Sequence, residues 1–330
     1  MFTGSEVHRR WIALVGINVL CSIVSSVICA EDAVGDLEIA ATVNGEPIYV
    51  SEVQRELRTA LGERKIADSA LPYFQAKALA QLVDRRLIVH WLRAQKHGAA
   101  KAEIDLEISR LRKQLRSRDI TLQRHLESLQ ITESEMRGLL EWQISWRKFL
   151  SRYMTEENLE KYFNDHRREF DGTRMRVAHI LFKLDDDDTE EEQLAIQNAA
   201  EIRESILKGE ISFEEAAKVH SIAPTSDKGG DIGFIQRNKP MHETFSRVAF
   251  ELKKDEISQP VVTPFGVHLI RCHAIETGQR RWRDAREQLT TAVTRYLFNW
   301  AAEKERSKAE IEFTDVIPHL EPGTGELAEE

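Results

Sequence analysis

The spacing of apolar residues changes along the chain, and each change predicts a different kind of structure. From about residue 34 to residue 170, apolar side chains recur every three or four positions, which places them on one face of an α-helix. One such series is Ile104, Ile108, Leu111 and Leu115. Residues 41–49, ahead of these helices, contain Asn44-Gly45, a pair that favours the type I′ turn of a β-hairpin. We predict a hairpin followed by a helical region.

Asp171-Gly172 is the predicted boundary of this region, because the periodicity after it alternates between strand and helix. We predict strands at 175–182, 231–234, 261–263 and 267–273, and helices at 189–208, 213–219 and 244–252. This mixture indicates a compact domain in which helices pack on one small sheet. The predicted fold class is therefore α+β.

A last helix is predicted at 282–304 and a last strand at 311–316. A single strand is not stable alone, and the hairpin near Ala41 is the partner that the other elements leave unpaired. We therefore expect the C-terminal helix and strand to pack on the N-terminal helical region. The α+β domain would then be an insertion in a mainly helical module.

Three helix starts carry the pattern of a capping box, in which a hydroxyl residue is followed by Glu or Gln three positions later. These pairs are Ser51 with Gln54, Thr132 with Glu135, and Ser212 with Glu215. Each pair predicts that a helix begins directly after its hydroxyl residue.

Composition narrows the class of protein. The chain has 330 residues and a formal net charge of −9, so its length suggests two domains and its charge argues against binding nucleic acid through phosphates. The basic residues between Arg110 and Arg118 are interleaved with other types, and we interpret them as the solvated face of a helix. Of three cysteines, Cys21 and Cys29 lie near the N-terminus, so an intrachain disulfide framework is not expected after processing.

The N-terminus is typical of an export signal. His8, Arg9 and Arg10 precede an apolar segment, Trp11 to Ile28, and a cut after Ala30 would remove it. The alternative is that the segment stays as a membrane anchor, since it is nearly long enough to span a bilayer. Either way we expect the protein to be exported, to the periplasm or another extracytoplasmic site, with inner-membrane anchoring and membrane contact only if the segment is uncleaved.

The candidate chemistry lies between Lys228 and His268. This stretch opens with Gly229-Gly230-Asp231-Ile232-Gly233 and ends with Thr263-Pro264-Phe265-Gly266-Val267-His268. Paired glycines suit a tight turn that leads into a strand, because glycine adopts positive φ without steric cost. A second histidine, His179, interrupts the apolar strand predicted upstream.

This order of motifs resembles the parvulin family of peptidyl-prolyl cis-trans isomerases from about Thr173 to Ala274. The matching motifs are Ala178-His179-Ile180-Leu181, Ser212-Phe213, Gly229-Gly230-Asp231, Phe250-Glu251-Leu252-Lys253 and Phe265-Gly266-Val267-His268. The resemblance implies a small antiparallel sheet with surrounding helices, and it implies isomerisation of X-Pro peptide bonds.

The resemblance also implies a role for each site residue. His179 and His268 correspond to the family's two facing histidines, and Thr263 to the hydroxyl beside them; these three are the catalytic candidates. The substrate-binding candidates are Ile232, Met241, Phe245 and Phe265. Two alternatives stay open: Met241 and Phe245, four residues apart, could simply pack a core, and the histidines could support the shape of the site without tuning its electrostatics.

Prolyl isomerisation requires rotation about a peptide bond against a barrier of about 18–20 kcal/mol, and it needs no nucleophile and no net proton transfer. We therefore expect no cofactor. We also expect no metal, because Cys272-His273 is an adjacent pair and lacks the spacing of zinc ligands. An apolar slot that binds the proline ring and removes water from the carbonyl is sufficient.

Two positions depart from family patterns. Ala223 stands where many parvulins carry Asp or Cys, which predicts weak isomerase activity; Asp227 is a candidate substitute. The acidic run Asp185 to Asp188 lies where some parvulins carry basic residues that bind phosphate, so binding of a phosphorylated substrate is not expected. We interpret the run as a solvated loop.

The flanking regions resemble SurA- and PrsA-like exported foldases and chaperones, whose terminal pieces form one module beside a parvulin domain. The predicted organisation is a signal or anchor (1–30), a helical chaperone-like domain (31–170), a parvulin domain (171–276), a C-terminal helix and strand (277–318) and a disordered tail (319–330). The expected partners are unfolded or partly folded polypeptides with X-Pro bonds. The predicted function is an exported isomerase and chaperone; the alternatives are a holdase with a weak or inactive parvulin domain, and an envelope-tethering protein.

Overall fold

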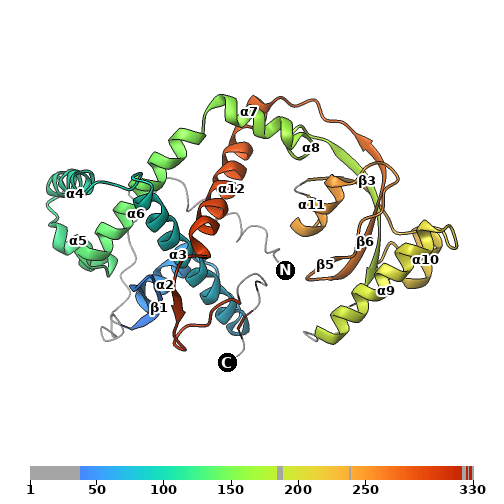
Figure 1. Cartoon of the computed structure of the whole chain (residues 1–330), viewed down its shortest axis with the longest axis horizontal. Coiled ribbons are helices and arrows are strands. Elements are labelled where there is room, and N and C mark those ends of the chain that lie inside the picture. The colour runs from blue at the N-terminus through green and yellow to red at the C-terminus, as the bar shows by residue number, and fades with distance from the viewer. Residues whose placement is uncertain (1–37, 184–188, 238, 322–324, 326, 329–330) are drawn as a thin grey trace. The chain divides into compact units, whose positions relative to one another are not determined.

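The structure is a computed structural model that describes residues 38–183, 189–237, 239–321, 325 and 327–328 (Figure 1). The predicted signal segment and the acidic run Asp185–Asp188 lie outside these residues. Contacts divide the chain into two compact units: Met1–Thr155 with Thr291–Glu330, here called the terminal unit, and Glu156–Thr290, here called the inserted unit. In the described part of the chain, every helix is too short or too polar to cross a membrane.

The terminal unit combines both ends of the chain. Its strands are β1 (Ile39–Val43), β2 (Glu46–Tyr49) and β7 (Ile311–Phe313), in the order β2-β1-β7. Its helices are α2 (Val50–Leu61), the short η1 (Asp68–Ala70), α3 (Leu71–Ala94), α4 (Lys101–Arg116), α5 (Leu122–Leu129), α6 (Glu133–Tyr153) and most of α12 (Arg286–Arg306). The predicted pairing of the last strand with the hairpin is confirmed, since β7 lies antiparallel to β1.

Asn44 explains why the hairpin and the last strand meet. Asn44 and Gly45 have φ angles of 51° and 77°, so the predicted turn with two positive φ values is present. The Asn44 side-chain oxygen accepts a hydrogen bond from the backbone N–H of Glu310, and the Asn44 N–H donates to the Glu310 carbonyl, at 2.9 and 2.8 Å. One residue thus forms the turn and holds the chain that enters β7.

The core of the terminal unit has an apolar part and an aromatic part. The small sheet buries Ala41, Val43 and Ile48 against α2 and α3. Trp91 of α3 lies edge-to-face with Phe149 of α6 and with Trp300 of α12, at centroid distances of 5.4 and 5.3 Å. Figure 1 shows α3, α6 and α12 next to one another, as these contacts require.

The start of the C-terminal tail differs from the expectation of disorder from residue 319. Ile317 is 5% exposed, and the His319 ring stacks on Phe313 at a centroid distance of 4.2 Å. Leu320 forms an isolated β-bridge with Leu327. Burial of these apolar and aromatic surfaces against β7 gives the segment a packing partner that its composition did not indicate.

The inserted unit is built on a four-stranded antiparallel sheet with the order β4-β3-β6-β5. Its strands are β3 (Arg174–Phe182), β4 (Asp231–Gln236), β5 (Val261–Thr263) and β6 (Gly266–Glu276). Its helices are α7 (Glu156–Asp165), α8 (Arg167–Phe170), α9 (Thr189–Leu207), α10 (Phe213–His220) and α11 (Glu243–Glu251), with the short η2 (Ser226–Lys228) and η3 (Trp282–Ala285). The predicted α+β class, a helical module with an inserted small antiparallel sheet, is confirmed.

Helices cover both faces of this sheet, as Figure 1 shows. Met175 and Val177 of β3 pack with α11, whereas Ala178 and Ile180 pack with α9 and α10. Because side chains alternate along a strand, His179 faces α11, and so does His268 of β6. The alternation therefore aims both histidines at the same helix.

The chain enters and leaves the sheet at one buried junction. The Asp171 carboxylate accepts hydrogen bonds from the Thr173 N–H and hydroxyl at 2.8 and 2.6 Å, and the Asp171 carbonyl accepts from the Arg280 N–H at 2.9 Å. Gly278 packs so closely that a Cβ there would lie 2.1 Å from the Asp171 carbonyl oxygen. The predicted boundary at Asp171-Gly172 is thus a tightly packed junction, and contacts group α7 and α8 with the sheet.

Candidate active site

Two buried histidines meet across β3 and β6. Leu181 of β3 is paired with His268, so His179 and His268 lie diagonally across the two strands. Their Nδ1 atoms are 3.1 Å apart and their rings are 16° from parallel. The exposed fractions are 8% for His179 and 4% for His268.

Thr263 completes this polar group. The β5–β6 hairpin brings the Thr263 hydroxyl oxygen to 2.8 Å from His268 Nε2. The same oxygen lies 3.2 Å from the carbonyl oxygen of Gly266, to which it can donate, and it accepts from the Phe265 N–H at 3.2 Å. The three residues predicted as catalytic therefore form one hydrogen-bonded chain.

Two proton arrangements satisfy the chain of contacts. In one, the Thr263 hydroxyl donates to Gly266, His268 Nε2–H donates to Thr263, and His179 Nδ1–H donates to His268 Nδ1. In the other, the hydroxyl donates to His268 Nε2 and His268 Nδ1–H donates to His179 Nδ1. Both keep both rings uncharged.

Burial favours the uncharged rings. It lowers the pKa of His179 to about 4, from an ordinary value of 6.5. For His268, burial together with the nearby His179 and His242 lowers the pKa to about 3. At neutral pH the site therefore presents donors and acceptors without a net charge.

Phe245 lies against both histidines from α11. It is 1% exposed, and its ring is perpendicular, at 82°, to the rings of His179 and His268 with centroids 5.8 and 5.3 Å away. Met241 and Ile232 pack in the same apolar cluster and are only partly buried. The cluster thus reaches the surface beside the imidazoles.

Phe265 occupies a different position from these three. It is 65% exposed, at the turn between β5 and β6, and its ring meets that of His242 edge-to-face at 6.4 Å. The structure therefore gathers His179, His268, Thr263 and Phe245 into one packed group, with Ile232 and Met241 in the apolar cluster of Phe245 and Phe265 on the exposed hairpin.

The paired glycines fix the loop that carries Ala223. Gly229 and Gly230 have φ angles of 66° and 80°, and a Cβ on Gly230 would lie 2.2 Å from the His179 carbonyl oxygen. The His179 N–H donates to the Gly230 carbonyl at 2.9 Å. Only glycine fits this close approach, so the turn locates the loop directly beside His179.

Ala223 is 2% exposed and contributes only a methyl group. Asp227, the candidate substitute, lies exposed in η2, and within the described residues no hydrogen bond joins it to either histidine. The Thr225 hydroxyl, two residues from Ala223, is buried without a hydrogen-bond partner in the described part of the chain. Thr225 is therefore a polar group of this loop that the sequence did not single out.

Two further supports of the site were not foreseen. The His242 ring accepts a hydrogen bond from the Thr244 N–H at 3.3 Å and so caps α11. The buried Arg237 donates to both carboxylate oxygens of Glu243 at 2.9 and 2.7 Å, and also to Glu169 at 3.2 Å. Both interactions hold the start of α11, the helix that carries Phe245. The only local indication in the sequence was that a polar residue stands two positions before Thr244.

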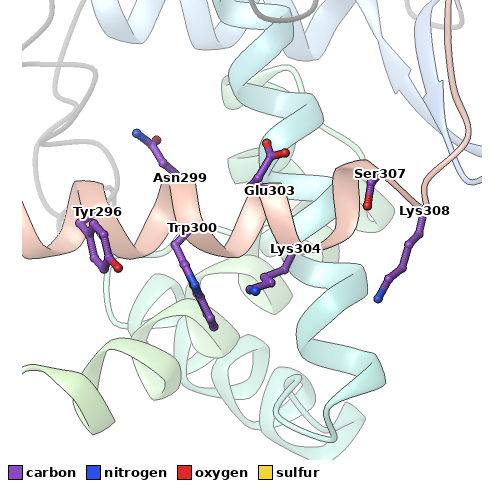
Figure 2. A pocket seen from close by; sticks show the side chains of 7 residues that line it. All are labelled: Tyr296, Asn299, Trp300, Glu303, Lys304, Ser307 and Lys308. Atoms are coloured by element: carbon purple, nitrogen blue, oxygen red, sulfur yellow. The ribbon is translucent and has the colours of Figure 1, made fainter.

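A separate hollow lies on α12 in the terminal unit, with a volume of about 600 Å³. It is lined by Tyr296, Asn299, Trp300, Glu303, Lys304, Ser307 and Lys308. Figure 2 shows Trp300 and Lys304 projecting to one side of the helix and Asn299 and Glu303 to the other. The Lys304 ammonium lies 5.4 Å from the Trp300 ring centroid.

The class of the inserted unit follows from this geometry and from comparison with known proteins. Residues 179–274 match the family described as Rotamase, the PPIC-type PPIase domain. This part of the inserted unit is a parvulin domain, and its enzyme class is peptidyl-prolyl cis-trans isomerase.

Longer matches extend beyond this domain. The chain is 26% identical over 290 residues to the foldase protein PrsA of Bacillus subtilis, covering 85% of this chain and 84% of PrsA. It is 34% identical over 155 residues to the chaperone SurA of Aromatoleum aromaticum, covering 46% of this chain and 31% of SurA. A crystal structure of PrsA from Bacillus anthracis aligns with a TM-score of 0.36 at 22% identity, covering 70% of this chain and 96% of that one.

Proposed function

We propose that this chain is an exported peptidyl-prolyl isomerase and chaperone that assists the folding of secreted or envelope proteins. Its substrates are unfolded or partly folded polypeptides with X-Pro bonds. The observation that carries the proposal is the packing of Phe245 against an uncharged histidine pair that is bonded to Thr263. Relatives named foldase and chaperone support the folding role.

Each side chain has a role in the proposed reaction. Phe245, Met241 and Ile232 bind the proline ring by burying its apolar surface. Phe265 contacts the substrate residues next to this proline. The histidines and Thr263 form the floor of the site. Because they carry no net charge, they do not stabilise the charge-separated resonance form of the planar amide, whereas a fixed cation beside the carbonyl oxygen would. Removal of water from the carbonyl then favours the twisted amide.

The chaperone role belongs to the terminal unit. The hollow on α12 presents the partly buried ring of Trp300, which lies against Trp91 and Phe149. A supported aromatic surface of this kind binds exposed apolar segments of a client by burial of area.

The proposed export of the protein depends on residues 1–30. N-terminal sequencing of the mature protein tests it: a start near Glu31 supports cleavage, whereas a retained Met1 supports the anchor.

A second candidate function is a holdase whose parvulin domain binds peptide with little turnover. The observation that favours it is Ala223, which is buried in the loop beside His179 and has no polar group. Loss of one polar contact to the transition state costs about 1–3 kcal/mol, which corresponds to roughly a 10–100-fold lower rate.

One experiment separates the two candidates. Turnover is measured from the slow, proline-limited refolding of RNase T1 with wild type, Phe245→Ala, Met241→Ala and Ala223→Asp. The proposal predicts acceleration by wild type, a roughly 10–100-fold loss in Phe245→Ala, a smaller loss in Met241→Ala, and a gain in Ala223→Asp. Val248→Ala, in the same cluster but not among the residues proposed to bind the proline ring, is the matched control and is expected to keep the wild-type rate.

Folding of each variant is checked by circular dichroism, since Phe→Ala in a core costs about 3–5 kcal/mol of stability. Met241 is partly exposed, so its variant tests the slot even if Phe245→Ala unfolds. If neither wild type nor Ala223→Asp accelerates refolding while wild type still suppresses aggregation of an unfolded client, the holdase function is correct.

A further inference from the structure

A cationic surface stands out on a chain of opposite charge. Between residues 110 and 124 there are six Lys or Arg side chains and one acid, Asp119, whereas the whole chain has a formal net charge of −9. These residues span the end of α4, the turn after it and the start of α5. Figure 1 shows α4 and α5 as neighbouring helices joined by this turn.

Most of these cations have no ion-pair partner among the described residues. Arg110 pairs with Glu107 at 2.8 Å and Arg112 lies 3.6 Å from Glu133. The other four are Lys113, Arg116, Arg118 and Arg124, here called the α4–α5 tip. All four are exposed, and in the described part of the chain no carboxylate lies within 4.0 Å of them.

Helix stability explains only part of this arrangement. Lys113 and Arg116 lie in the last turn of α4, where a cation interacts favourably with the helix dipole. Arg124 lies in the first turn of α5, where the dipole disfavours a cation, and Arg118 lies beyond the end of α4. In addition, Arg112 and Lys113 are four and three residues from Arg116, a spacing at which like charges repel.

The geometry favours a planar anionic partner over a single anion. The four side chains belong to two helices and the turn between them, and each is exposed, so their charges are spread over the surface of the α4–α5 tip. The planar layer of phosphate headgroups at a membrane surface can contact all four side chains at once, because its charges are spread over an area. At physiological ionic strength charges are screened over about 8 Å, so the acidic remainder of the chain does not cancel this contact.

We propose that the α4–α5 tip is a docking surface for the anionic phospholipids of a membrane. The end of the terminal unit formed by this tip contacts the bilayer. This contact is separate from any insertion of residues 1–30. It would hold the terminal unit at the surface over which an exported client emerges.

The test is cosedimentation of the full chain with vesicles of phosphatidylcholine alone or mixed with phosphatidylglycerol. The tip variant carries Lys113→Gln, Arg116→Gln, Arg118→Gln and Arg124→Gln. The matched control removes four exposed cations elsewhere in the terminal unit through Arg58→Gln, Arg64→Gln, Lys65→Gln and Lys96→Gln, so both variants have the same net charge. Vesicles without phosphatidylglycerol measure the contribution of the apolar N-terminal segment.

We expect wild type and the control to bind the anionic vesicles much more tightly than the neutral ones. A cation near an anionic surface contributes about fivefold in affinity, so the tip variant is expected to lose roughly a hundredfold or more. Salt at about 1 M, which shortens the screening length to about 3 Å, should abolish the difference. Equal binding by the tip variant and the control overturns the proposal, as does binding of wild type to polyglutamate or nucleic acid but not to anionic vesicles.

Discussion

A buried ion pair of the terminal unit and a buried neutral group of the inserted unit differ in charge and in proposed use. In the terminal unit, Arg85 of α3 donates to both carboxylate oxygens of Glu56 in α2 at 2.7 and 2.8 Å, and each residue is 8% exposed. In the inserted unit, His179, His268 and Thr263 are buried as a hydrogen-bonded group without net charge. The first group is an ion pair and the second is neutral.

This difference shows what each kind of buried group can do. A bidentate ion pair requires one geometry, because each charge is costly when its partner is displaced. It therefore fixes α2 against α3. A neutral imidazole pair can exchange donor and acceptor roles without creating a buried charge, which suits a surface that must accept substrates of varied sequence. The ion pair therefore suits a structural role, and the imidazole pair suits the proposed active site.

The largest expected effect is that of breaking the ion pair. Glu56→Ala leaves the Arg85 guanidinium buried and unpaired, so it should lower the free energy of unfolding of the terminal unit by about 3–5 kcal/mol. Isomerase activity should be unchanged, since the inserted unit contains the proposed active site. Urea unfolding reports this through Trp91, Trp142, Trp146 and Trp300, which lie in the terminal unit.

The control is Glu107→Ala, which removes the partly buried partner of the exposed Arg110 and should cost within about 1 kcal/mol. Adding Arg85→Met to Glu56→Ala should restore part of the lost stability, because it removes the unpaired charge. A loss of isomerase activity without a loss of stability would mean that the ion pair serves the site, and the comparison would be wrong.

A smaller effect is expected from pH on the inserted unit. The folded pKa values of about 4 for His179 and about 3 for His268 lie below the ordinary value of 6.5, so below pH 6.5 the unfolded chain binds more protons than the folded one. Stability of the inserted unit should therefore be constant above about pH 6.5 and fall by a few kcal/mol as pH drops towards 4.

Hydrogen exchange of β3 and β6 amides, corrected for intrinsic rates, measures this change. Imidazole NMR signals of His179 and His268 should stay in their neutral form at pH 5. Protonation of either ring at pH 6 in the folded protein would show that the site is charged under working conditions.

Much of the fold could be predicted because its causes are local in sequence. The capping boxes at Thr132 and Ser212 are present, with Glu135 and Glu215 accepting the N–H of each cap residue at 2.8 and 3.1 Å. The one at Ser51 was wrong: α2 begins at Val50, and the Glu52 carboxylate accepts the Tyr49 N–H at 3.2 Å instead. Burial of Val50 and Val53 against the hairpin selects this earlier start.

Only part of the candidate site could be predicted from the sequence. Alternation along β3 and β6 places His179 and His268 on one face of the sheet. The resemblance to the parvulin family indicated that Thr263 and Phe245 lie beside them. Nothing local indicates that Arg237 joins Glu243 and Glu169, because the three come from segments that meet only in the folded unit. The Thr225 hydroxyl, which has no hydrogen-bond partner among the described residues, likewise could not be identified before the packing of the Gly229-Gly230 turn on β3 was known.

The smallest effect that sharpens the comparison comes from Thr263. Thr263→Val keeps the shape but removes the hydroxyl, so His268 Nε2 and the Phe265 N–H both lose a partner, at a cost of about 1–2 kcal/mol. If this hydroxyl orients the histidine pair, kcat/KM should fall by roughly tenfold, and Thr263→Ser, which keeps the hydroxyl, should recover most of it. Stability lost equally in both variants, with unchanged turnover, would make Thr263 a packing residue. The neutral group would then have a structural role like that of the ion pair, and the two groups would differ only in charge.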